Sequence, residues 1–280
     1  MSAIAIEQII QEVKDLPTLP GVVMELLNTI DQDDMNINEL AQKVSRDIAL
    51  TAKTLRYANS VYYATMVKVA TIPQAITLLG LDTFKQMVMI AALSGCFPEN
   101  KCKGFSHKRF WYHSNAVAIA AKILARRLNF NLDLAFTAGL LHDIGSLVLV
   151  THYLSEYEAT IAFRLEHQVT QFEAERQVLG IDHAVVGEAL ANQWQFSELM
   201  AKAIGGHHQP DKPGLGFLAT IVHVADGIAH ALNISTTPDH TPPEISGQAW
   251  ESLGLDQASL EEVLAEAQLQ FDKLNAEMDV

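Results

Sequence analysis

Apolar residues recur with helical spacing along almost the whole chain. Positions three and four apart are apolar in the segments 6–13, 22–30, 40–44, 48–58, 82–91, 110–124, 183–194 and 222–229. Alternating apolar runs and Asn-Gly hairpin turns, which would indicate strands, are absent. The pattern therefore predicts an all-α fold.

Short polar motifs mark several predicted helix ends. Thr71 followed by Pro73 is a start signal, because proline is tolerated in the first turn of a helix. Gly80 is expected to cap the end of that helix, and Asp182 is expected to cap the start of another. Asn36, three residues before Glu39, forms an Asn-led variant of the capping box.

Two polar breaks divide the chain into three segments. The segment 98–106 is basic and contains a glycine, and the segment 235–248 is rich in proline and threonine. We therefore predict two helical lobes, residues 1–98 and 99–234, followed by a C-terminal segment, 235–280. Within this C-terminal segment a single apolar stripe predicts a helix that lies on another surface: Leu260, Val263, Leu264, Ala267 and Phe271.

Composition and charge narrow the classes of function. Of the 280 residues 49% are hydrophobic, and a chain of that size buries a core without disulfides. The net charge of −14 argues against binding to nucleic acid or to an anionic membrane. The chain has two cysteines, and its segment Met1–Lys14 is not expected to be a signal peptide. Its most apolar stretch, Met87–Cys96, is shorter than the roughly 20 residues of a membrane span. We expect a cytoplasmic protein.

Candidate chemistry gathers in the segment 99–234, where polar side chains fall on apolar helix faces. The candidates are His113, His142, Asp143, His183, His207, His208 and Asp226. If the helices pack together, His113 and Asp226 join the pair His142-Asp143 in one set of nitrogen and oxygen donors. Such a set suits iron, manganese, zinc or nickel, and not calcium. The other three histidines could complete a second metal position.

Each histidine also has a simpler interpretation. A histidine on an apolar face is more often a hydrogen-bonded core residue than a ligand. His223 and His230 lie at helical spacing around Asp226, so we expect them to be its hydrogen-bond partners. The remaining histidines show no pattern and are expected in solvent: His107, His152, His167 and His240.

Several motifs resemble a known family. The run Leu141-His142-Asp143-Ile144-Gly145 resembles the signature of the HD superfamily of metal-dependent phosphohydrolases. Upstream, the runs at 16–20 (LPTLP), 44–50 (VSRDIAL), 55–60 (LRYANS) and 74–80 (QAITLLG) are similar to the HDOD domain, a bacterial signalling relative of the HD fold. The resemblance extends from about Leu16 to Leu232.

The resemblance implies a helical fold in two lobes, of which the second is an HD-type bundle. It implies His113 as the first metal ligand, His142 and Asp143 as the central pair and Asp226 as the last ligand, with Asp143 as the catalytic residue. His183 and one of the adjacent pair His207 and His208 match additional histidines of the HD-GYP phosphodiesterase branch.

The chain departs from the active hydrolases at two places. Ser146 stands where a lysine usually follows the Ile-Gly, and a lysine there would help to hold a phosphate. After His208 the chain reads Gln209-Pro210-Asp211, without the Gly-Tyr-Pro motif. Both departures weaken the expectation of cyclic dinucleotide hydrolysis, but they leave metal binding untouched.

These observations predict an HDOD-type regulatory protein that retains an HD centre with one or two divalent ions. Its partner would be a signalling protein or a nucleotide. The alternative is a metal-dependent phosphohydrolase or phosphodiesterase acting on a nucleotide or another phosphate ester. A segment at 39–55 has some features of a helix-turn-helix, but it carries too few basic residues to overcome the acidity of the chain. Basic residues at 101–109 and 122–127 are expected to be solvated and paired with the acidic tail.

Overall fold

A computed structural model describes residues 21, 23–24, 37–59, 68–97, 101–232 and 243–275. Within these ranges the regular structure is helical and no strand occurs, which confirms the all-α prediction. The chain divides into two compact units, one containing Glu99–Leu269 and the other Pro17–Pro98. The predicted helix at 6–13, most of that at 22–30, Asn36 and His240 lie outside the described residues.

The smaller unit contains four described helices: α3 (Ile37–Arg46), α4 (Ile48–Ala58), α5 (Ile72–Leu79) and α6 (Leu81–Cys96). Both α4 and α5 pack on α6. The predicted ends of α5 are confirmed, because the side chain of Thr71 accepts a hydrogen bond from the Gln74 N–H and Pro73 lies in the first turn. Gly80 ends the helix with a φ of 82°, a value that favours glycine.

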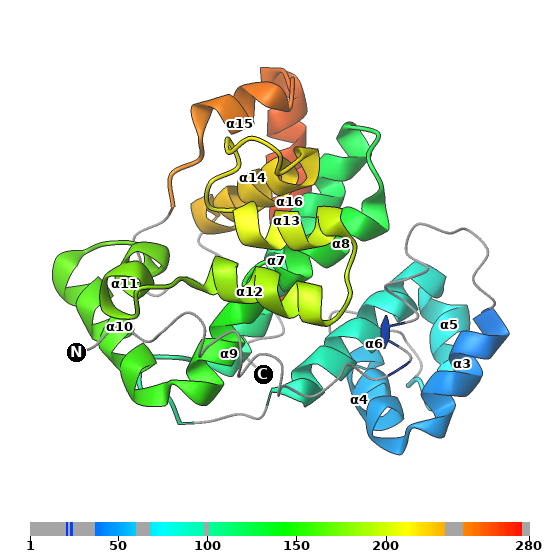
Figure 1. Cartoon of the computed structure of the whole chain (residues 1–280). Helices are drawn as coiled ribbons and strands as arrows, with labels where there is room; N and C mark the ends of the chain where they lie inside the picture. Colours follow the sequence, from blue (N-terminus) through cyan, green and yellow to red (C-terminus); the bar gives the residue numbers. More distant parts are fainter. Residues whose placement is uncertain are drawn as a thin grey trace. The chain divides into compact units, whose positions relative to one another are not determined.

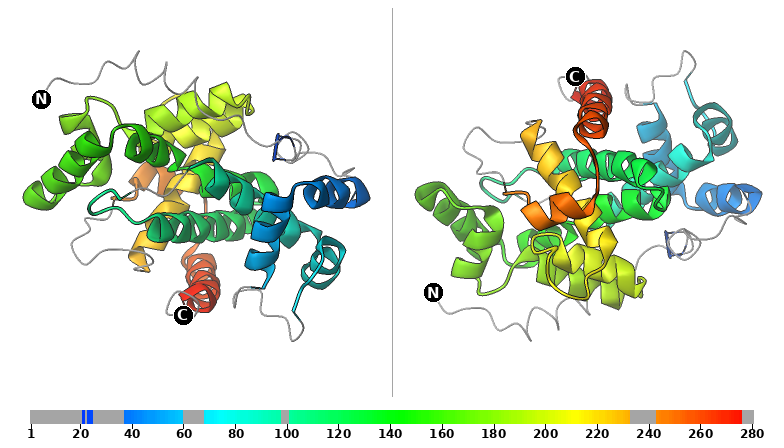
Figure 2. Two further views of the ribbon diagram at one scale, coloured as in Figure 1. Left: turned by 90° about the horizontal axis from the view of Figure 1, so that it is seen from below. Right: turned by 90° about the horizontal axis from the view of Figure 1, so that it is seen from above.

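The larger unit is a helical bundle (Figures 1 and 2). Its helices are α7 (His107–Arg127), α8 (Leu132–Leu141), α9 (Ile144–His152), α10 (Leu154–His167), α11 (Gln171–Val178), α12 (His183–Gln193), α13 (Glu198–Gly206), α14 (Phe217–Ala231), α15 (Gly247–Ser252) and α16 (Gln257–Asn275), which begins in this unit. The long helix α7 packs along α8 and α14, while α9 and α13 both pack on α12.

Besides Met87–Cys96, the longer stretch Leu132–His152, which contains α8 and α9, is long and apolar enough to cross a membrane by length and composition alone. However, 89% of its most apolar window is buried inside the protein, as in a core helix. The pair His142 and Asp143 separates the two helices; His142 is buried, and Asp143 is partly exposed.

Two glycines let helix backbones meet on either side of that pair. A Cβ atom at Gly139 would lie 2.8 Å from the Cα of Ala118 in α7. A Cβ atom at Gly145 would lie 2.0 Å from the carbonyl oxygen of His183 and 2.6 Å from the amide nitrogen of Gly187, both in α12. No side chain fits at either position without moving a helix, so the pair is held between two close backbone contacts.

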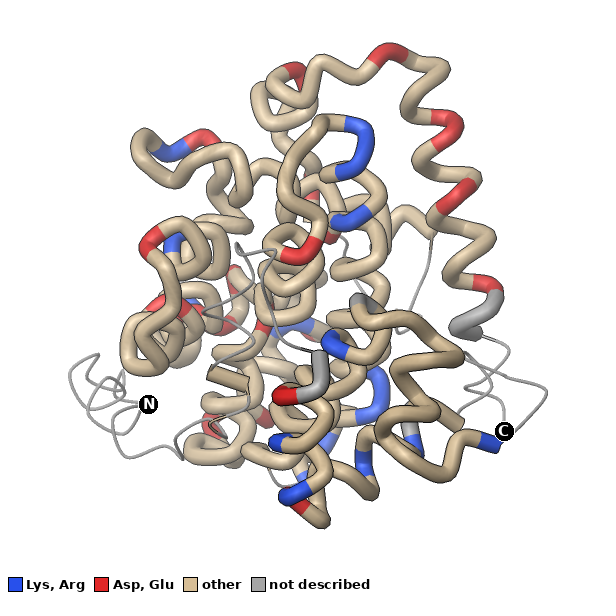
Figure 3. Tube along the Cα trace, turned by 90° about the vertical axis from the view of Figure 1, so that its right-hand side faces the viewer, with Lys and Arg blue, Asp and Glu red and all other residues tan. Residues whose placement is uncertain are grey.

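The C-terminal helix α16 contains the predicted apolar stripe, and Val263 and Ala267 of that stripe are fully buried. Acidic positions recur along it (Figure 3). Two of them pair with the end of α7: Arg126 lies 2.8 Å from Glu266 and Arg127 lies 2.6 Å from Glu262. The expected pairing of basic residues with the acidic tail is therefore confirmed for these two arginines.

Candidate metal centre

Two histidines at helix ends have a fixed tautomer. His142 follows α8, and its Nδ1 lies 2.7 Å from the carbonyl oxygen of Gly139. His207 follows α13, and its Nδ1 lies 2.7 Å from the carbonyl oxygen of Ile204. A carbonyl oxygen only accepts, so the proton of each neutral ring sits on Nδ1. The Nε2 atom of each ring then carries a lone pair for a metal ion.

His183 is held by a carboxylate instead. It is the first residue of α12, and the side chain of Asp182 caps that helix as predicted. The Oε2 atom of Glu175 in α11 accepts hydrogen bonds from the His183 backbone N–H at 2.8 Å and from Nδ1 at 2.7 Å. Glu175 is fully buried. A carboxylate that orients an imidazole in this way is a common support of metal-ligating histidines.

Asp143 lies at the centre of the cluster and uses both of its carboxylate oxygens. Its Oδ1 lies 3.1 Å from the Nε2 of His183 and 3.5 Å from that of His207. Its Oδ2 lies 3.3 Å from the Nε2 of His142 and 3.9 Å from that of His113. The carboxylate thus faces two groups of imidazoles, and it could bridge two ions.

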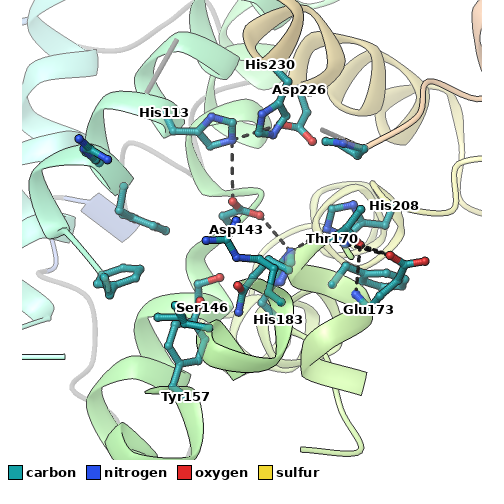
Figure 4. A pocket seen from close by; sticks show the side chains of 18 of the residues that line it. His113, Asp143, Ser146, Tyr157, Thr170, Glu173, His183, His208, Asp226 and His230 are labelled. Atoms are coloured by element: carbon teal, nitrogen blue, oxygen red, sulfur yellow. Dashed lines mark hydrogen bonds and ion pairs between the residues drawn. The ribbon is translucent and has the colours of Figure 1, made fainter. Parts of the chain in front are cut away.

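Asp226, in the middle of α14, completes one of these groups. Its Oδ1 lies 3.1 Å from the Nε2 of His113 and 3.9 Å from that of His142. His230, one turn further along α14, approaches the same oxygen to 3.2 Å. Figure 4 shows His113, Asp226 and His230 turned toward one another above Asp143, with His183 and His208 on its other side.

The donors fit a divalent ion. Two donor atoms about 2.1 Å from one ion lie about 3.0 Å apart at a right angle and about 4.2 Å apart on opposite sides. The distances around Asp143 and Asp226 fall within or close to that range. The buried Nε2 atoms of His142 and His207 make no hydrogen bond within the described residues. The Nε2 atoms of His183 and His208 face each other at 2.8 Å, so a proton or a cation must lie between them.

The charges in the cluster also favour a cation. Burial by itself raises the pKa of Asp143, but the imidazoles of His142 and His183 outweigh it and hold the pKa well below the usual range. Burial likewise opposes ionisation of Asp226, and His230 and His113 hold its pKa well below the usual range. Both carboxylates therefore stay charged at neutral pH.

The two facing imidazoles behave differently from each other. Burial lowers the pKa of His183, but Glu175 and Asp143 outweigh burial and raise it well above the usual value. Burial and then the neighbouring His207 and His183 lower the pKa of His208 well below the usual value. Without a metal ion, the shared proton of this pair therefore belongs to His183.

The cluster opens onto a cavity of about 770 Å³ in the larger unit, a size typical of small-molecule sites. Its wall includes aromatic side chains at 105, 110 and 172 and the cations Arg109 and Arg164. Ser146 and Tyr157 also line it. At the position where the hydrolases carry a lysine, this cavity therefore presents a pair of hydroxyl groups.

The structure brings all seven predicted ligands into this cluster, but other sequence interpretations fail. His223 does not contact Asp226, because its Nδ1 lies 2.6 Å from the carbonyl oxygen of His207 and its Nε2 accepts from the Ser246 N–H. Of these two histidines only His230 contacts Asp226, the partner that was expected for both. His107 is buried rather than solvated.

Glu175 is the functional residue that sequence reasoning missed. It stands in the polar run QFEAERQV of α11, and it is buried where that helix packs on α10. The capping box of Thr170 and Glu173 marks the start of the helix, but no local pattern indicates that Glu175 faces inward.

The family model of the HDOD domain matches residues 16–210. The chain belongs to the HDOD domain family. An HDOD domain protein of unknown function from Geobacter sulfurreducens has a similar structure, with a TM-score of 0.76 and 25% identity over 95% of this chain and 97% of that one. A Shewanella amazonensis protein, provisionally described as a phosphohydrolase, has a TM-score of 0.74 and 30% identity over 96% of this HDOD chain and 97% of its own.

Curated relatives of this HDOD protein are longer than the chain. An uncharacterized protein of Treponema pallidum is 22% identical over 202 residues, which are 71% of this chain and 39% of the relative. Ribonuclease Y of Geobacter sulfurreducens is 31% identical over 121 residues, which are 43% of this chain and 18% of the relative. The chain thus spans well under half the length of these two relatives.

Proposed function

We propose that this HDOD protein binds one or two divalent transition-metal ions, of iron, manganese, zinc or nickel, and hydrolyses a phosphate ester. One observation carries the proposal: the imidazoles of five predicted ligands converge on the carboxylates of Asp143 and Asp226 beside a cavity of about 770 Å³. The likeness to a protein described as a phosphohydrolase and the partial likeness to a ribonuclease, an enzyme that cleaves phosphodiesters, support it.

A divalent ion at this cluster would act as a Lewis acid on a phosphate oxygen and lower the pKa of water. His113, His142 and Asp226 would hold it on one side of Asp143, and His183, His207 and His208 would hold an ion on the other side. Asp143 would bridge the two, and 22% of its side chain is exposed to the cavity. The Ser146 and Tyr157 hydroxyls can donate hydrogen bonds to a bound phosphate.

A second candidate is a regulatory module that binds a nucleotide or a signalling protein without turnover. The absence of a lysine at position 146 favours it, since a fixed cation beside Asp143 would help to hold a phosphate dianion. The metal centre would then have a structural or ligand-binding role.

Metal analysis and one activity screen separate these functions. The purified protein would be assayed for bound metal by mass spectrometry. It would then be tested with bis-p-nitrophenyl phosphate, p-nitrophenyl phosphate and nucleotides in the presence of manganese or iron. We expect bound metal, turnover of at least one ester, and loss of both in His142→Ala. Bound metal without turnover would favour the regulatory module, and absence of metal would refute the hydrolase.

A further inference from the structure

His230 lies in the metal cluster although the resemblance assigns it no role. It follows Asp226 by one helical turn on α14, so the two side chains project side by side. Its Nε2 lies 3.2 Å from Asp226 Oδ1, its ring centroid lies 4.8 Å from that of His113, and it lines the same cavity. Only 11% of the side chain is exposed. Figure 4 shows it beside Asp226 and facing His113.

Distances place His230 on a par with the ligands already assigned. Donor atoms of His113, Asp226 and His230 all lie within 4.8 Å of one another, as donors around a single ion do. The separation from Asp226 Oδ1 is 3.2 Å for His230, 3.1 Å for His113 and 3.9 Å for His142. His230 is thus nearer to this carboxylate oxygen than one of the residues in the central pair.

We propose that His230 is a metal ligand, which joins His113 and Asp226 as a third donor to the ion on their side of Asp143. This inference rests on the proposed metal centre. Two imidazoles and a carboxylate form a nitrogen and oxygen set, which suits a transition-metal ion rather than calcium. Positions not taken by these three residues would be left for the neighbouring donors and for a ligand that enters from the cavity.

The competing role for His230 is that of a positioning residue, which donates a hydrogen bond to Asp226 and never contacts the ion. Two substitutions separate the roles. Glutamine in His230→Gln keeps a hydrogen-bond donor but is a poor ligand. Glutamate in His230→Glu supplies a ligand oxygen but places a second negative charge beside Asp226. A ligand role is rescued by glutamate, and a donor role is rescued by glutamine.

Binding of Mn²⁺ to the metal-free full-length chain would be followed by the electron paramagnetic resonance signal of the free ion. Pulsed measurements on the loaded protein would count its nitrogen couplings. We expect His230→Gln to weaken binding at one site at least about tenfold and to remove one nitrogen coupling, while His230→Glu stays within about threefold of wild type. His152→Gln, which removes an exposed histidine outside the cluster, should bind like wild type.

The outcomes are distinct. Unchanged binding and unchanged nitrogen couplings in His230→Gln would overturn the inference. So would weakened binding in both His230 variants, because a carboxylate ligand should hold the ion. Absence of Mn²⁺ binding by the wild-type chain would instead refute the proposed metal centre on which the inference rests.

Discussion

Gly145 offers a sharp test of how the cluster is held, because its replacement by alanine introduces a single methyl group. That methyl would lie 2.0 Å from the carbonyl oxygen of His183 and 2.6 Å from the amide nitrogen of Gly187. Both neighbours are backbone atoms, so no side chain can rotate away. Since Cβ atoms do not approach closer than 3.0 Å, α9 and α12 must separate by about 1 Å.

The cost follows from that displacement. Overpacking of a core costs about 1–3 kcal/mol, and a clash with backbone belongs at the upper end. Alanine regains about 1 kcal/mol of helix propensity relative to glycine. The net loss of about 2 kcal/mol corresponds to a fall in Tm of about 4–8 °C for a unit of this size. The carbonyl that is displaced belongs to His183, so metal occupancy on its side of Asp143 should fall as well.

Circular dichroism melting of Gly145→Ala would measure the change. Gly247→Ala is the matched control, because nothing lies within 4 Å of the added methyl at the start of α15. We expect the control to melt within about 2 °C of wild type, as an isolated surface substitution should. If Gly145→Ala melted like the control and kept its full metal content, the close contact between α9 and α12 would not be a constraint on the centre.

Four further outcomes are expected. Glu175→Gln should weaken metal binding on the His183 side about 10–100-fold in a competition titration, and unchanged affinity would show that the carboxylate support is dispensable. A chelator should lower the Tm, since an ion at 100 times its Kd stabilises the fold by about 2.7 kcal/mol; equal melting curves would contradict a bound ion. Protonated His183 cannot offer Nε2, so affinity measured against pH should fall as the pH drops through its raised pKa, and a flat profile would exclude His183. Arg127→Ala breaks an exposed ion pair with Glu262 and should cost less than about 1 kcal/mol in urea unfolding; a larger loss would mean that α16 is held mainly by charge.

The helices and most of the site could be predicted because their signals are local. Apolar spacing and capping residues such as Thr71 and Asp182 depend on a few neighbouring positions, and the structure confirms them. The convergence of the ligands depends on tertiary packing, which local patterns do not show. It could be predicted because the His142-Asp143 motif and the motifs upstream of it resemble the HDOD domain.

The predictions that failed concern residues whose surroundings are set by tertiary contacts. Glu175 lies on α11, which packs on α10, and it bonds to His183 at the start of α12. No pattern within α11 distinguishes it from the exposed acid Glu173. His223 and His230 have the same kind of spacing from Asp226, yet only His230 reaches it. The backbone carbonyl of His207 and the amide of Ser246 take the two ring nitrogens of His223, and both partners are distant in sequence.

The supports of the imidazoles differ in how easily mutation can remove them. His142 and His207 rely on backbone carbonyls, which no substitution deletes, although a side chain at position 139 would force a helix to move. His183 relies on the side chain of Glu175, which one nucleotide change can eliminate. The two halves of the centre are therefore unequal in genetic robustness. If the centre binds two ions as proposed, a descendant of this chain would be expected to lose the one beside His183 first.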